Sequence, residues 1–442
     1  MLTFTKNRLY ILIFAAAILT LVGIVLAAAF IHFRSVSNKP NIILITIDAL
    51  RADHLSCYGY EKDTSSTIDM LARKGVMFSQ MIAQASWTVP AMYSISTSTY
   101  PSTHGMLWFD RVLSKKILTL PQLLRIKNFK TAFISGHGGL SDARGFERGF
   151  DISYDRFQNA EMITTKSMNW ITENKKNKFF LWIHYMDTHD SALHIPEEKH
   201  YVRNITKEEQ EKYTLDYEKA ISYIDNQIAN LLKKLKELNI YENTVIILTA
   251  DHGQELGEHE LIFHHGGSLR EALLKIPLII SYPKLFFSKN VFTQQVQQID
   301  IAPTICKLLN VKKPFFFEGR DLLNLIRKSR TQSIGIYSEH VENEEDLSSN
   351  EWRYSVVSLR LPPWKLIYTF SPDNNNQYSL YNIENDPLEN INLIDSQKER
   401  FDFLRKCLDK FHHRRKEMSL FSSGRHIEDE AKDRLKSLGY LQ

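Results

Sequence analysis

Two apolar runs that each end in an acidic residue constrain the fold of this chain more than any other feature. Residues 41–48 read Asn-Ile-Ile-Leu-Ile-Thr-Ile-Asp, and residues 244–253 read Thr-Val-Ile-Ile-Leu-Thr-Ala-Asp-His-Gly. Runs that are continuously apolar and rich in β-branched residues predict strands covered on both faces, as in a parallel sheet between helices. Because sites in such sheets form at the carboxyl ends of the strands, we expect Asp48, Asp251 and His252 to lie together at one rim.

Two carboxylates and an imidazole at one rim are the side chains of a metal site. The structural alternative is that Asp48 and Asp251 only begin turns or cap helices. The occurrence of both segments in one chain, with Gly253 directly after His252, favours metal binding.

A third segment supplies a hydroxyl group. Residues 86–97 predict a loop that enters a helix, with Pro90 in the first helical turn and Thr88 just before it. A hydroxyl at this place faces the positive end of the helix dipole, which suits a group that carries a transferred anion. The structural alternative is that Thr88 is only the N-cap of the helix.

The amino terminus has a different composition from the rest of the chain. Residues 9–31 are almost wholly apolar and uncharged, with basic residues on both sides. This run exceeds the length of about 20 residues that spans the hydrocarbon core of a bilayer, whereas the apolar region of a signal peptide has about 7 to 15 residues. We therefore predict one transmembrane helix, with cleavage near the alanines at 27–29 as the alternative.

The remaining pattern predicts an α/β fold. Apolar strands alternate with helical patterns up to about residue 310, including a helix at 217–238, and residues 364–370 suggest a strand of a smaller sheet. The predicted organisation is a cytoplasmic stub and membrane anchor at 1–34, a linker at 35–40, a catalytic domain at 41–325, a smaller C-terminal subdomain at 326–396 and a charged helical tail at 397–442.

Charge and cysteine content exclude some classes of protein. The chain has 55 basic and 51 acidic residues among 442, a net charge of +4, which gives no reason to expect a nucleic-acid partner. The three cysteines, Cys57, Cys306 and Cys407, are far apart and in no metal-binding spacing. They predict neither a disulfide framework nor a zinc finger.

Several motifs, taken in order, resemble those of the sulfatases of the alkaline phosphatase superfamily, over roughly residues 40 to 440. The motifs lie at residues 48–60, 87–90, 100–105, 145–151, 184–189, 251–259, 299–304 and 380–387. The resemblance implies an alkaline-phosphatase-like sandwich, in which helices cover a large, mainly parallel sheet and a smaller C-terminal sheet follows.

The resemblance also implies roles for individual residues. Asp48, Asp251 and His252 match the metal-binding positions, and Thr88 stands where sulfatases carry the Cys or Ser that becomes formylglycine. The histidines that match or approach substrate-contacting positions are His137, His189 and His265. His184, His194, His259 and His264 flank matched positions, and we expect them to be structural.

The chain departs from the sulfatase pattern at three positions. The signature Cys-x-Pro-Ser-Arg here reads Thr-Val-Pro-Ala-Met, so Thr88 replaces the modified residue and Met92 replaces the Arg that anchors it. Oxidation of Thr would give a ketone, so no formylglycine is expected. Ala49 replaces the second Asp of the usual Asp-Asp pair. A Thr nucleophile is the pattern of relatives that transfer phosphoryl groups.

These residues predict one divalent cation, held by Asp48, Thr88, Asp251 and His252, that activates the Thr88 hydroxyl for attack. The cation is zinc, manganese, calcium or magnesium. His189 and His265 are expected to bind the substrate and to protonate the leaving oxygen.

The predicted function is hydrolysis of sulfate or phosphate esters by a membrane-anchored enzyme, with phosphoesters and phosphodiesters favoured. The substrate is an anionic ester on a glycan, a lipid headgroup or a small molecule. The N-terminus is expected inside and the catalytic domain outside the cytoplasm. Two alternatives remain: a transferase of phosphoethanolamine or phosphoglycerol headgroups, and a non-catalytic sulfatase-like binding protein.

Overall fold

The computed structural model divides the chain into two compact units, Met1–Pro40 and Asn41–Gln442. It describes residues 39–108, 111–138, 140, 144–155, 159–190, 206–259, 265–286, 290–327, 334–341, 356–370 and 376–418. The predicted membrane helix lies outside these ranges. Within them, no helix is both long and apolar enough to cross a membrane.

A large sheet forms the centre of the second unit. In the described part of the chain it has nine strands in the order β4-β3-β5-β1-β6-β7-β2-β8, with β9 paired to β2. The strands are β1 (Asn41–Ile47), β2 (Val76–Ile82), β3 (Lys130–Ser135), β4 (Ile152–Asp155), β5 (Phe179–Tyr185), β6 (Thr244–Ala250), β7 (Lys275–Ser281), β8 (Asn290–Phe292) and β9 (Val296–Gln297). Strands β4, β3, β5, β1 and β6 are parallel, whereas β7 runs antiparallel to both β6 and β2.

The two runs that opened the sequence analysis are the central strands β1 and β6. All seven residues of each strand are buried, as their uninterrupted apolar sequences predict. The strands are parallel neighbours, with Ile47 opposite Ala250. This pairing brings the residues that follow each strand to the same edge of the sheet.

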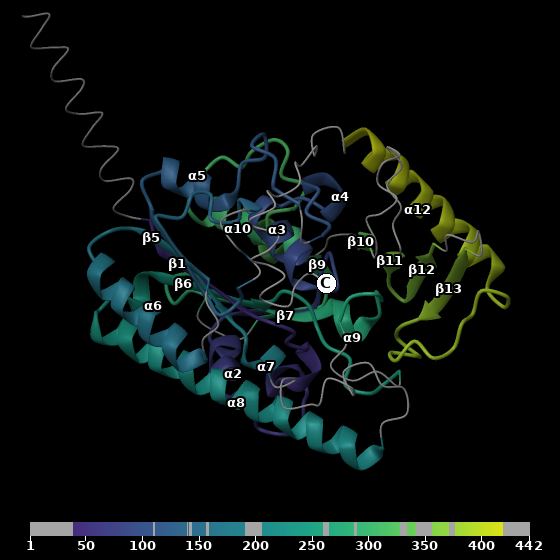
Figure 1. Ribbon diagram of the computed structural model, residues 1–442, viewed down its shortest axis with the longest axis horizontal. Helices are drawn as coiled ribbons and strands as arrows, with labels where there is room; N and C mark the ends of the chain where they lie inside the picture. Colours follow the sequence, from purple (N-terminus) through teal and green to yellow (C-terminus); the bar gives the residue numbers. More distant parts are fainter. Residues whose placement is uncertain are drawn as a thin grey trace, which may run out of the picture. The chain divides into compact units, whose positions relative to one another are not determined.

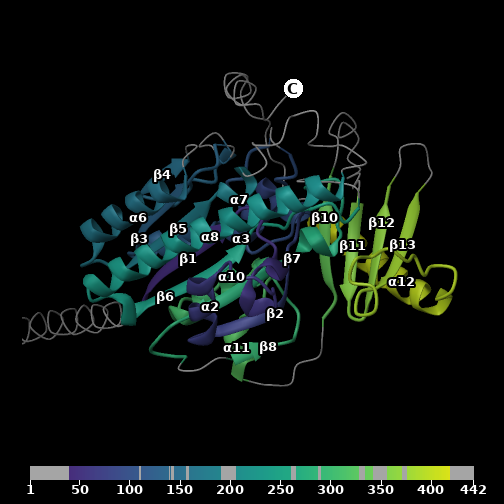
Figure 2. The same ribbon diagram turned by 90° about the horizontal axis from the view of Figure 1, so that it is seen from below.

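Helices cover both faces of this sheet. Helices α6 and α8 lie along one face, and α3, α5 and α10 lie over the other (Figures 1 and 2). The helices are α2 (Ser66–Arg73), α3 (Thr88–Thr97), α4 (Pro101–His104), α5 (Leu120–Ile126), α6 (Ala160–Asn174), α7 (Asp187–Asp190), α8 (Lys207–Glu237), α9 (Glu271–Leu274), α10 (Ile301–Leu308), α11 (Leu322–Arg327) and α12 (Lys398–Met418). Short 3-10 turns are η1 (Ala52–His54), η2 (Ser56–Tyr58), η6 (Tyr241–Asn243) and η7 (Gln298–Asp300).

Helix α8 begins ten residues before the predicted start at residue 217, at Lys207. Its first turns are polar, so no apolar period marked them. Thr206 and Glu209 form a capping box there, in which each side chain accepts a hydrogen bond from the backbone N–H of the other residue.

A second, antiparallel sheet follows, as predicted. Its order is β10-β11-β12-β13, with bounds Ile336–His340, Val356–Leu361, Trp364–Thr369 and Gln377–Asn382. Helix α12 packs its buried Leu404 and Leu408 against Leu359, Leu366 and Leu380 of this sheet. The residue boundaries proposed for the domains stay predictions.

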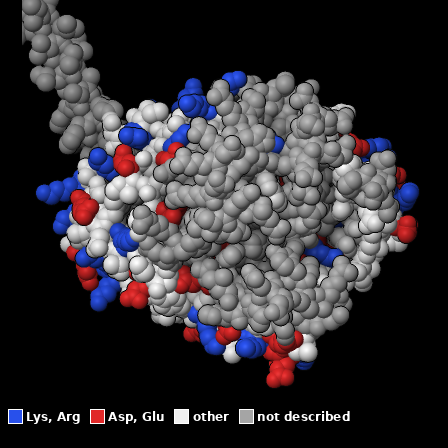
Figure 3. Space-filling view, viewed as in Figure 1, with Lys and Arg blue, Asp and Glu red and all other residues white. Residues whose placement is uncertain are grey.

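Acidic and basic side chains are interspersed on the described surface seen in Figure 3. This mixture agrees with the nearly balanced composition of the chain.

Candidate active site

The carboxyl ends of β1 and β6 bring Asp48, Asp251 and His252 together. Each residue offers one ligand atom, and these three atoms lie within 4.8 Å of one another. All three residues are fully buried. The predicted meeting of these side chains at one rim is therefore confirmed, because adjacent parallel strands that end level with each other place their next residues side by side.

The donor atoms of this cluster fit a divalent cation. Asp48 Oδ1 and Asp251 Oδ2 are buried and have no hydrogen-bond partner among the described residues. His252 Nδ1 lies 2.8 Å from the carbonyl oxygen of Gly253, which can only accept, so Nδ1 carries the proton. The lone pair of His252 Nε2 therefore faces the carboxylates, 3.8 Å from Asp48 Oδ1 and 3.4 Å from Asp251 Oδ2. Two carboxylates and an imidazole lone pair suit a divalent metal ion.

The two carboxyl groups differ in their electrostatic surroundings. Burial acts to raise the pKa of Asp48, but its contact with His184 and the nearby His189 and His252 outweigh this effect and hold it well below the usual value. Burial and the charge of Asp48 raise the pKa of Asp251. Two carboxylates so close in a buried site repel each other unless a cation lies near them.

Thr88 reaches this cluster from the start of α3. Its Oγ1 lies 3.3 Å from Asp48 Oδ2 and 3.2 Å from His252 Nε2. The helix begins at Thr88, so Thr88 is its first residue rather than the one before it, and Trp87 is the N-cap. Pro90 lies in the first turn, as predicted. Because the Thr88 hydroxyl contacts the cluster and makes no capping hydrogen bond, the simple N-cap alternative is wrong.

Two of the predicted substrate histidines lie beside the cluster. The ring of His265 stacks on that of His252, with centroids 4.9 Å apart and planes at 24°. The ring of His189, in the short helix α7, lies 5.0 Å from that of His265. The structure thus brings both histidines to the side of the candidate metal ligands, where the resemblance implies substrate-contacting roles.

His184 lies between His137 and the cluster. Its ring is 6.1 Å from that of His184, which in turn contacts Asp48. His137 is 4% exposed, and burial lowers its pKa to about 3. It is therefore a neutral imidazole at neutral pH, able to donate or accept one hydrogen bond.

His184 has a closer relation to the site than the sequence suggested. It lies within strand β5, opposite Thr46 of β1, and its Nε2 is 3.3 Å from Asp48 Oδ2. Its Nδ1 is 2.9 Å from Thr46 Oγ1, and that oxygen accepts a hydrogen bond from Trp182 Nε1 at 3.0 Å. The chain of contacts from Trp182 through Thr46 and His184 orients the Asp48 carboxylate, as hydrogen-bond partners of ligand side chains do at metal sites. The strand register was needed to see it.

The positions that depart from the sulfatase pattern have structural roles of their own. Ala49 adopts a left-handed conformation with φ of 55°. Its N–H donates to Asp251 Oδ1 at 3.1 Å, and its carbonyl accepts from the Tyr217 hydroxyl at 2.7 Å. The backbone of Ala49 thus holds Asp251, although its side chain supplies no ligand. Met92 is fully buried in the main hydrophobic core.

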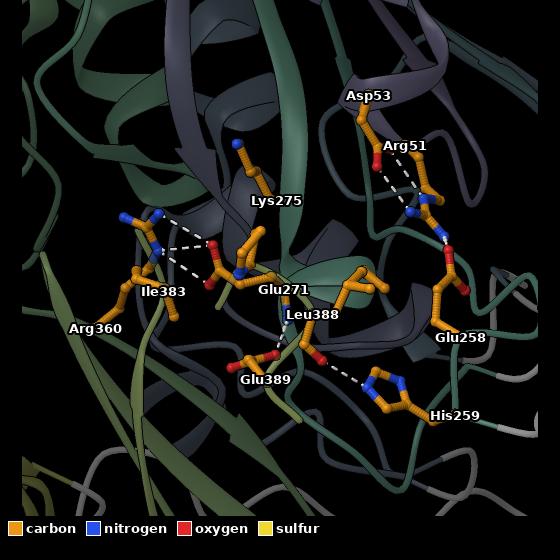
Figure 4. Close-up of a pocket in the computed structure, with 12 residues that line it drawn as sticks. Arg51, Asp53, Glu258, His259, Glu271, Lys275, Arg360, Ile383, Leu388 and Glu389 are labelled. Carbon is orange, nitrogen blue, oxygen red and sulfur yellow. Dashed lines mark hydrogen bonds and ion pairs between the residues drawn. The ribbon is translucent and has the colours of Figure 1, made fainter. Parts of the chain in front are cut away.

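Arg51 ties the loop after β1 to the loop after β6. Its guanidinium donates to both carboxylate oxygens of Asp53, to the carboxylate of Glu258, and to the carbonyl of Gln254 at 3.1 Å (Figure 4). Arg51 is 5% exposed. Because these loops carry Asp48 and His252, the Arg51 contacts fix the spacing between the two halves of the site.

The comparisons with known proteins agree with this geometry. The sulfatase family model matches residues 40–311, and a model described as N-sulphoglucosamine sulphohydrolase, C-terminal, matches residues 257–417. An ulvan-active sulfatase of Formosa agariphila is 25% identical over 338 residues, which cover 66% of this chain and 65% of that protein. An N-acetylglucosamine-6-O-sulfatase of Bacteroides thetaiotaomicron is 20% identical over 81% of this chain and 83% of its own length.

Solved structures share the fold at low identity. A 2-O GAG sulfatase is 18% identical and superposes with a TM-score of 0.74, covering 88% of this chain and 95% of its own. A phosphonate monoester hydrolase of Agrobacterium radiobacter is 16% identical, with a TM-score of 0.67 and coverage of 84% and 95%. The family model spans well over half of the sequence. The chain therefore belongs to the sulfatase family.

Proposed function

We propose that this chain is a metal-dependent ester hydrolase in which the Thr88 hydroxyl is the nucleophile, and that phosphate esters are its preferred substrates. The observation that carries this proposal is the position of Thr88 Oγ1, within 3.3 Å of both Asp48 Oδ2 and His252 Nε2 at the start of α3. A buried hydroxyl among metal-ligand types, at the positive end of a helix, is suited to attack an anionic ester.

Each residue of the site has a separate role in the proposed reaction. A cation held by Asp48, Asp251, His252 and Thr88 would lower the pKa of the hydroxyl and stabilise negative charge on the transferred group. The Thr88 proton has an acceptor in reach at Asp48 Oδ2, because the lone pair of His252 Nε2 would be taken by the cation. The α3 N-terminus favours the anionic group that Thr88 would carry.

The reaction takes two steps. A bond forms between Thr88 Oγ1 and phosphorus while the bond from phosphorus to the leaving oxygen breaks, and that oxygen takes a proton from His265 or His189. Water then attacks phosphorus while the bond from phosphorus to Thr88 Oγ1 breaks, so phosphate is released. Thr88 Oγ1 takes back its proton from Asp48 Oδ2, which restores the hydroxyl. In this second step the histidine that lost its proton takes one from the attacking water.

The residue at position 88 favours phosphoryl over sulfuryl transfer. Thr cannot form the aldehyde of formylglycine, so the usual sulfatase nucleophile is not expected here. The fold is shared with a phosphonate monoester hydrolase as well as with sulfatases. Because several relatives are named for sulfated glycans, a sulfate ester is the second candidate, and the substrate class we propose is an anionic ester on a glycan, a lipid headgroup or a small molecule.

We also propose that residues 9–31 anchor the protein in a membrane, with the catalytic domain outside the cytoplasm. The length and lack of charge of this segment support the anchor. Protease treatment of sealed cells or vesicles tests the orientation, because a domain on the outer side is digested without lysis.

The decisive experiment compares nitrophenyl sulfate, nitrophenyl phosphate and bis-nitrophenyl phosphate as substrates of the purified chain, with each candidate metal added. Thr88→Ala removes the nucleophile, and Thr88→Ser retains a hydroxyl as the matched control. We expect phosphoester cleavage that Thr88→Ala abolishes and Thr88→Ser largely keeps. Full turnover by Thr88→Ala would reject the proposal.

Two other results would change the proposed function. Sulfate cleavage, with a carbonyl group detected at residue 88 by mass spectrometry, would overturn the absence of a modified nucleophile. Metal binding without turnover of any ester would favour a headgroup transferase or a sulfatase-like binding protein.

A further inference from the structure

The turn that carries His265 is held from two sides by hydrogen-bond acceptors that lie far from it in the sequence. The Gly266 N–H donates to the carbonyl of Ser86 at 2.8 Å, and the Gly267 N–H donates to His340 Nε2 at 2.9 Å. Both glycines have left-handed φ values, +80° and +59°, so the turn depends on residues without a Cβ. The Ser86 carbonyl and His340 Nε2 thus hold the turn from outside, while the Ser268 N–H donates to the Gly266 carbonyl within it.

The two acceptors come from the parts of the molecule that the turn must join. Ser86 lies two residues before Thr88, and His340 is the last residue of β10 in the second sheet. The turn thus links His265 to the segment of the proposed nucleophile on one side and to the second sheet on the other.

Strand β10 is itself fastened to the segment that leads to Thr88. Ser338 Oγ donates to the carbonyl of Ala83 at 2.6 Å, and the Glu339 N–H donates to the carbonyl of Gln84 at 2.9 Å. His340 follows directly and is 5% exposed. Because these contacts join β10 to the segment just before α3, they position the His340 imidazole relative to Thr88.

We propose that His340 is a positioning residue that sets the place of His265 relative to Thr88 by accepting the Gly267 N–H at Nε2. The inference rests on the proposed function and adds to it a residue from the second sheet. Nε2 can accept only when it is unprotonated, so Nδ1 carries the proton of the His340 ring.

A shift of the turn has a direct consequence for the chemistry. The His265 ring stacks on His252 and lies beside His189. Movement of the turn would change the distance from His265 to the leaving oxygen of a substrate bound at Thr88. A displacement of about 1 Å at a reacting group can cost about 100-fold in rate.

Two substitutions of His340 in the full-length chain distinguish the effect of its hydrogen-bond acceptor from the effect of its ring volume. His340→Phe keeps a ring but removes the acceptor, whereas His340→Gln puts an amide oxygen near the position of Nε2. His413→Phe, at an exposed histidine of α12, is the matched control. Each protein is assayed with the nitrophenyl and the phenyl form of the ester that the wild type hydrolyses fastest.

We expect His340→Phe to lower kcat about tenfold or more, with KM changed less than about threefold. The loss should be larger on the phenyl ester, because its leaving oxygen is more basic and depends more on a placed proton donor. His340→Gln and His413→Phe should stay within about threefold of the wild type. Equal losses on both esters, equal losses in the Phe and Gln variants of His340, or no loss at all would overturn the proposal.

A spectroscopic measurement tests the placement without turnover. The ring resonances of His265, assigned by their absence in His265→Gln, should move in His340→Phe and stay in place in His340→Gln. Unchanged resonances in His340→Phe would overturn the positioning role. If the wild type hydrolysed no ester, the proposed function would be rejected, while these resonances would still decide whether His340 places His265.

Discussion

Two of the buried groups of charged side chains in the described part of the chain differ in how far their charges are balanced. The first is the strand-end site at Asp48 and Asp251. The second, which we call the ion-pair cluster, joins α9 to the second sheet. It consists of Glu271, Arg360, Lys365 and Glu389, of which Figure 4 shows Glu271, Arg360 and Glu389.

The ion-pair cluster has two cations for two carboxylates. Glu271 accepts from Arg360 Nε and Nη2 at 3.0 Å and from Lys365 Nζ at 3.1 Å. Lys365 Nζ also lies 2.9 Å from Glu389 Oε1, and Glu389 Oε2 accepts the Glu271 N–H at 2.7 Å. Burial raises the pKa of Glu271, but the two cations outweigh it and lower that pKa to about 2.

The strand-end site has two buried carboxylates, and among the described residues the groups that lower their pKa by charge are the imidazoles of His184, His189 and His252. One oxygen of each carboxylate has no hydrogen-bond partner in the described ranges. The contrast teaches how a structural cluster is told from a functional one. The ion-pair cluster balances its two carboxylates with its own two cations, whereas the strand-end site needs an added cation to balance its carboxylates.

The largest expected effect is on activity at the strand-end site. Asp251→Asn removes one carboxylate charge but keeps an oxygen for the N–H groups of Ala49 and His252. We expect kcat/KM to fall at least about 1,000-fold, which corresponds to about 4 kcal/mol of transition-state stabilisation.

The same substitution should not weaken the metal-free fold. Removal of one of two adjacent buried carboxylates relieves repulsion, so the melting temperature in a chelator should stay equal or rise. Esterase assays and thermal melting with a chelator measure the two effects. A lower melting temperature in the chelator would mean that the site is structural, like the ion-pair cluster.

The next effect is on stability at the ion-pair cluster. Lys365→Met leaves Glu271 and Glu389 with one cation between them, and loss of one partner of a buried pair costs about 3–5 kcal/mol. Urea unfolding measures the change. The matched control is Lys275→Met, because Lys275 lines the pocket in Figure 4 and has no ion-pair partner within the described ranges. We expect the control to lie within about 0.5 kcal/mol of the wild type. Equal effects of both substitutions would contradict a structural role for the cluster.

A smaller effect is the gain in unfolding free energy on cation binding, which should depend on the strand-end site but not on the ion-pair cluster. A cation that binds the folded state stabilises it by about 2.7 kcal/mol when present at 100 times its dissociation constant. The wild type and Lys365→Met should both gain this amount, because distant sites act additively. Asp48→Asn should gain much less. Urea unfolding with and without the cation tests this, and loss of the gain in Lys365→Met would show that the cluster helps to bind metal.

The sequence predicted the strand-end site well because the information is local. Asp48 and Asp251 follow directly after β1 and β6, whose apolar runs identify central strands without knowledge of their neighbours. The motifs around Thr88, His189 and His265 added their positions through resemblance. The sequence did not predict the start of α8, because its first turns are polar and show no apolar period. It also did not predict that β7 runs antiparallel to its neighbours, because a buried strand has the same apolar pattern in either direction.

The contacts between the two sheets could not be predicted. His340 lies 73 residues from Gly267 in the sequence. Arg360 and Lys365 lie in strands β11 and β12, and a charged residue in a strand is normally predicted to face solvent. Arg360 is 4% exposed and Lys365 is fully buried. Only the packing of the second sheet on α9 pairs them with carboxylates. His184 is an intermediate case, because its strand was readable but its contact with Asp48 follows from the register of β5 against β1.

The smallest expected effect concerns His259, which connects the two regions. Its Nδ1 lies 3.1 Å from Glu255 Oε2, and its Nε2 lies 2.7 Å from the carbonyl oxygen of Leu388, next to Glu389 of the ion-pair cluster. Both ring nitrogens face acceptors, so only the protonated ring satisfies both. Burial lowers the pKa of His259, but Glu255 and the Leu388 carbonyl outweigh it and raise that pKa above its ordinary value.

A raised folded-state pKa gives stabilisation that is complete below the unfolded value of about 6.5 and is lost as the pH rises through the folded value. We expect wild type to exceed His259→Gln in unfolding free energy by roughly 1 kcal/mol at acidic pH. The difference should shrink above neutrality. Urea unfolding of both proteins across this pH range measures it, and the subtraction removes titrations that they share, including those of the strand-end site. A difference that does not change with pH would mean that His259 links the loop after β6 to Leu388 as a neutral ring, so the connection between the two regions would not depend on charge.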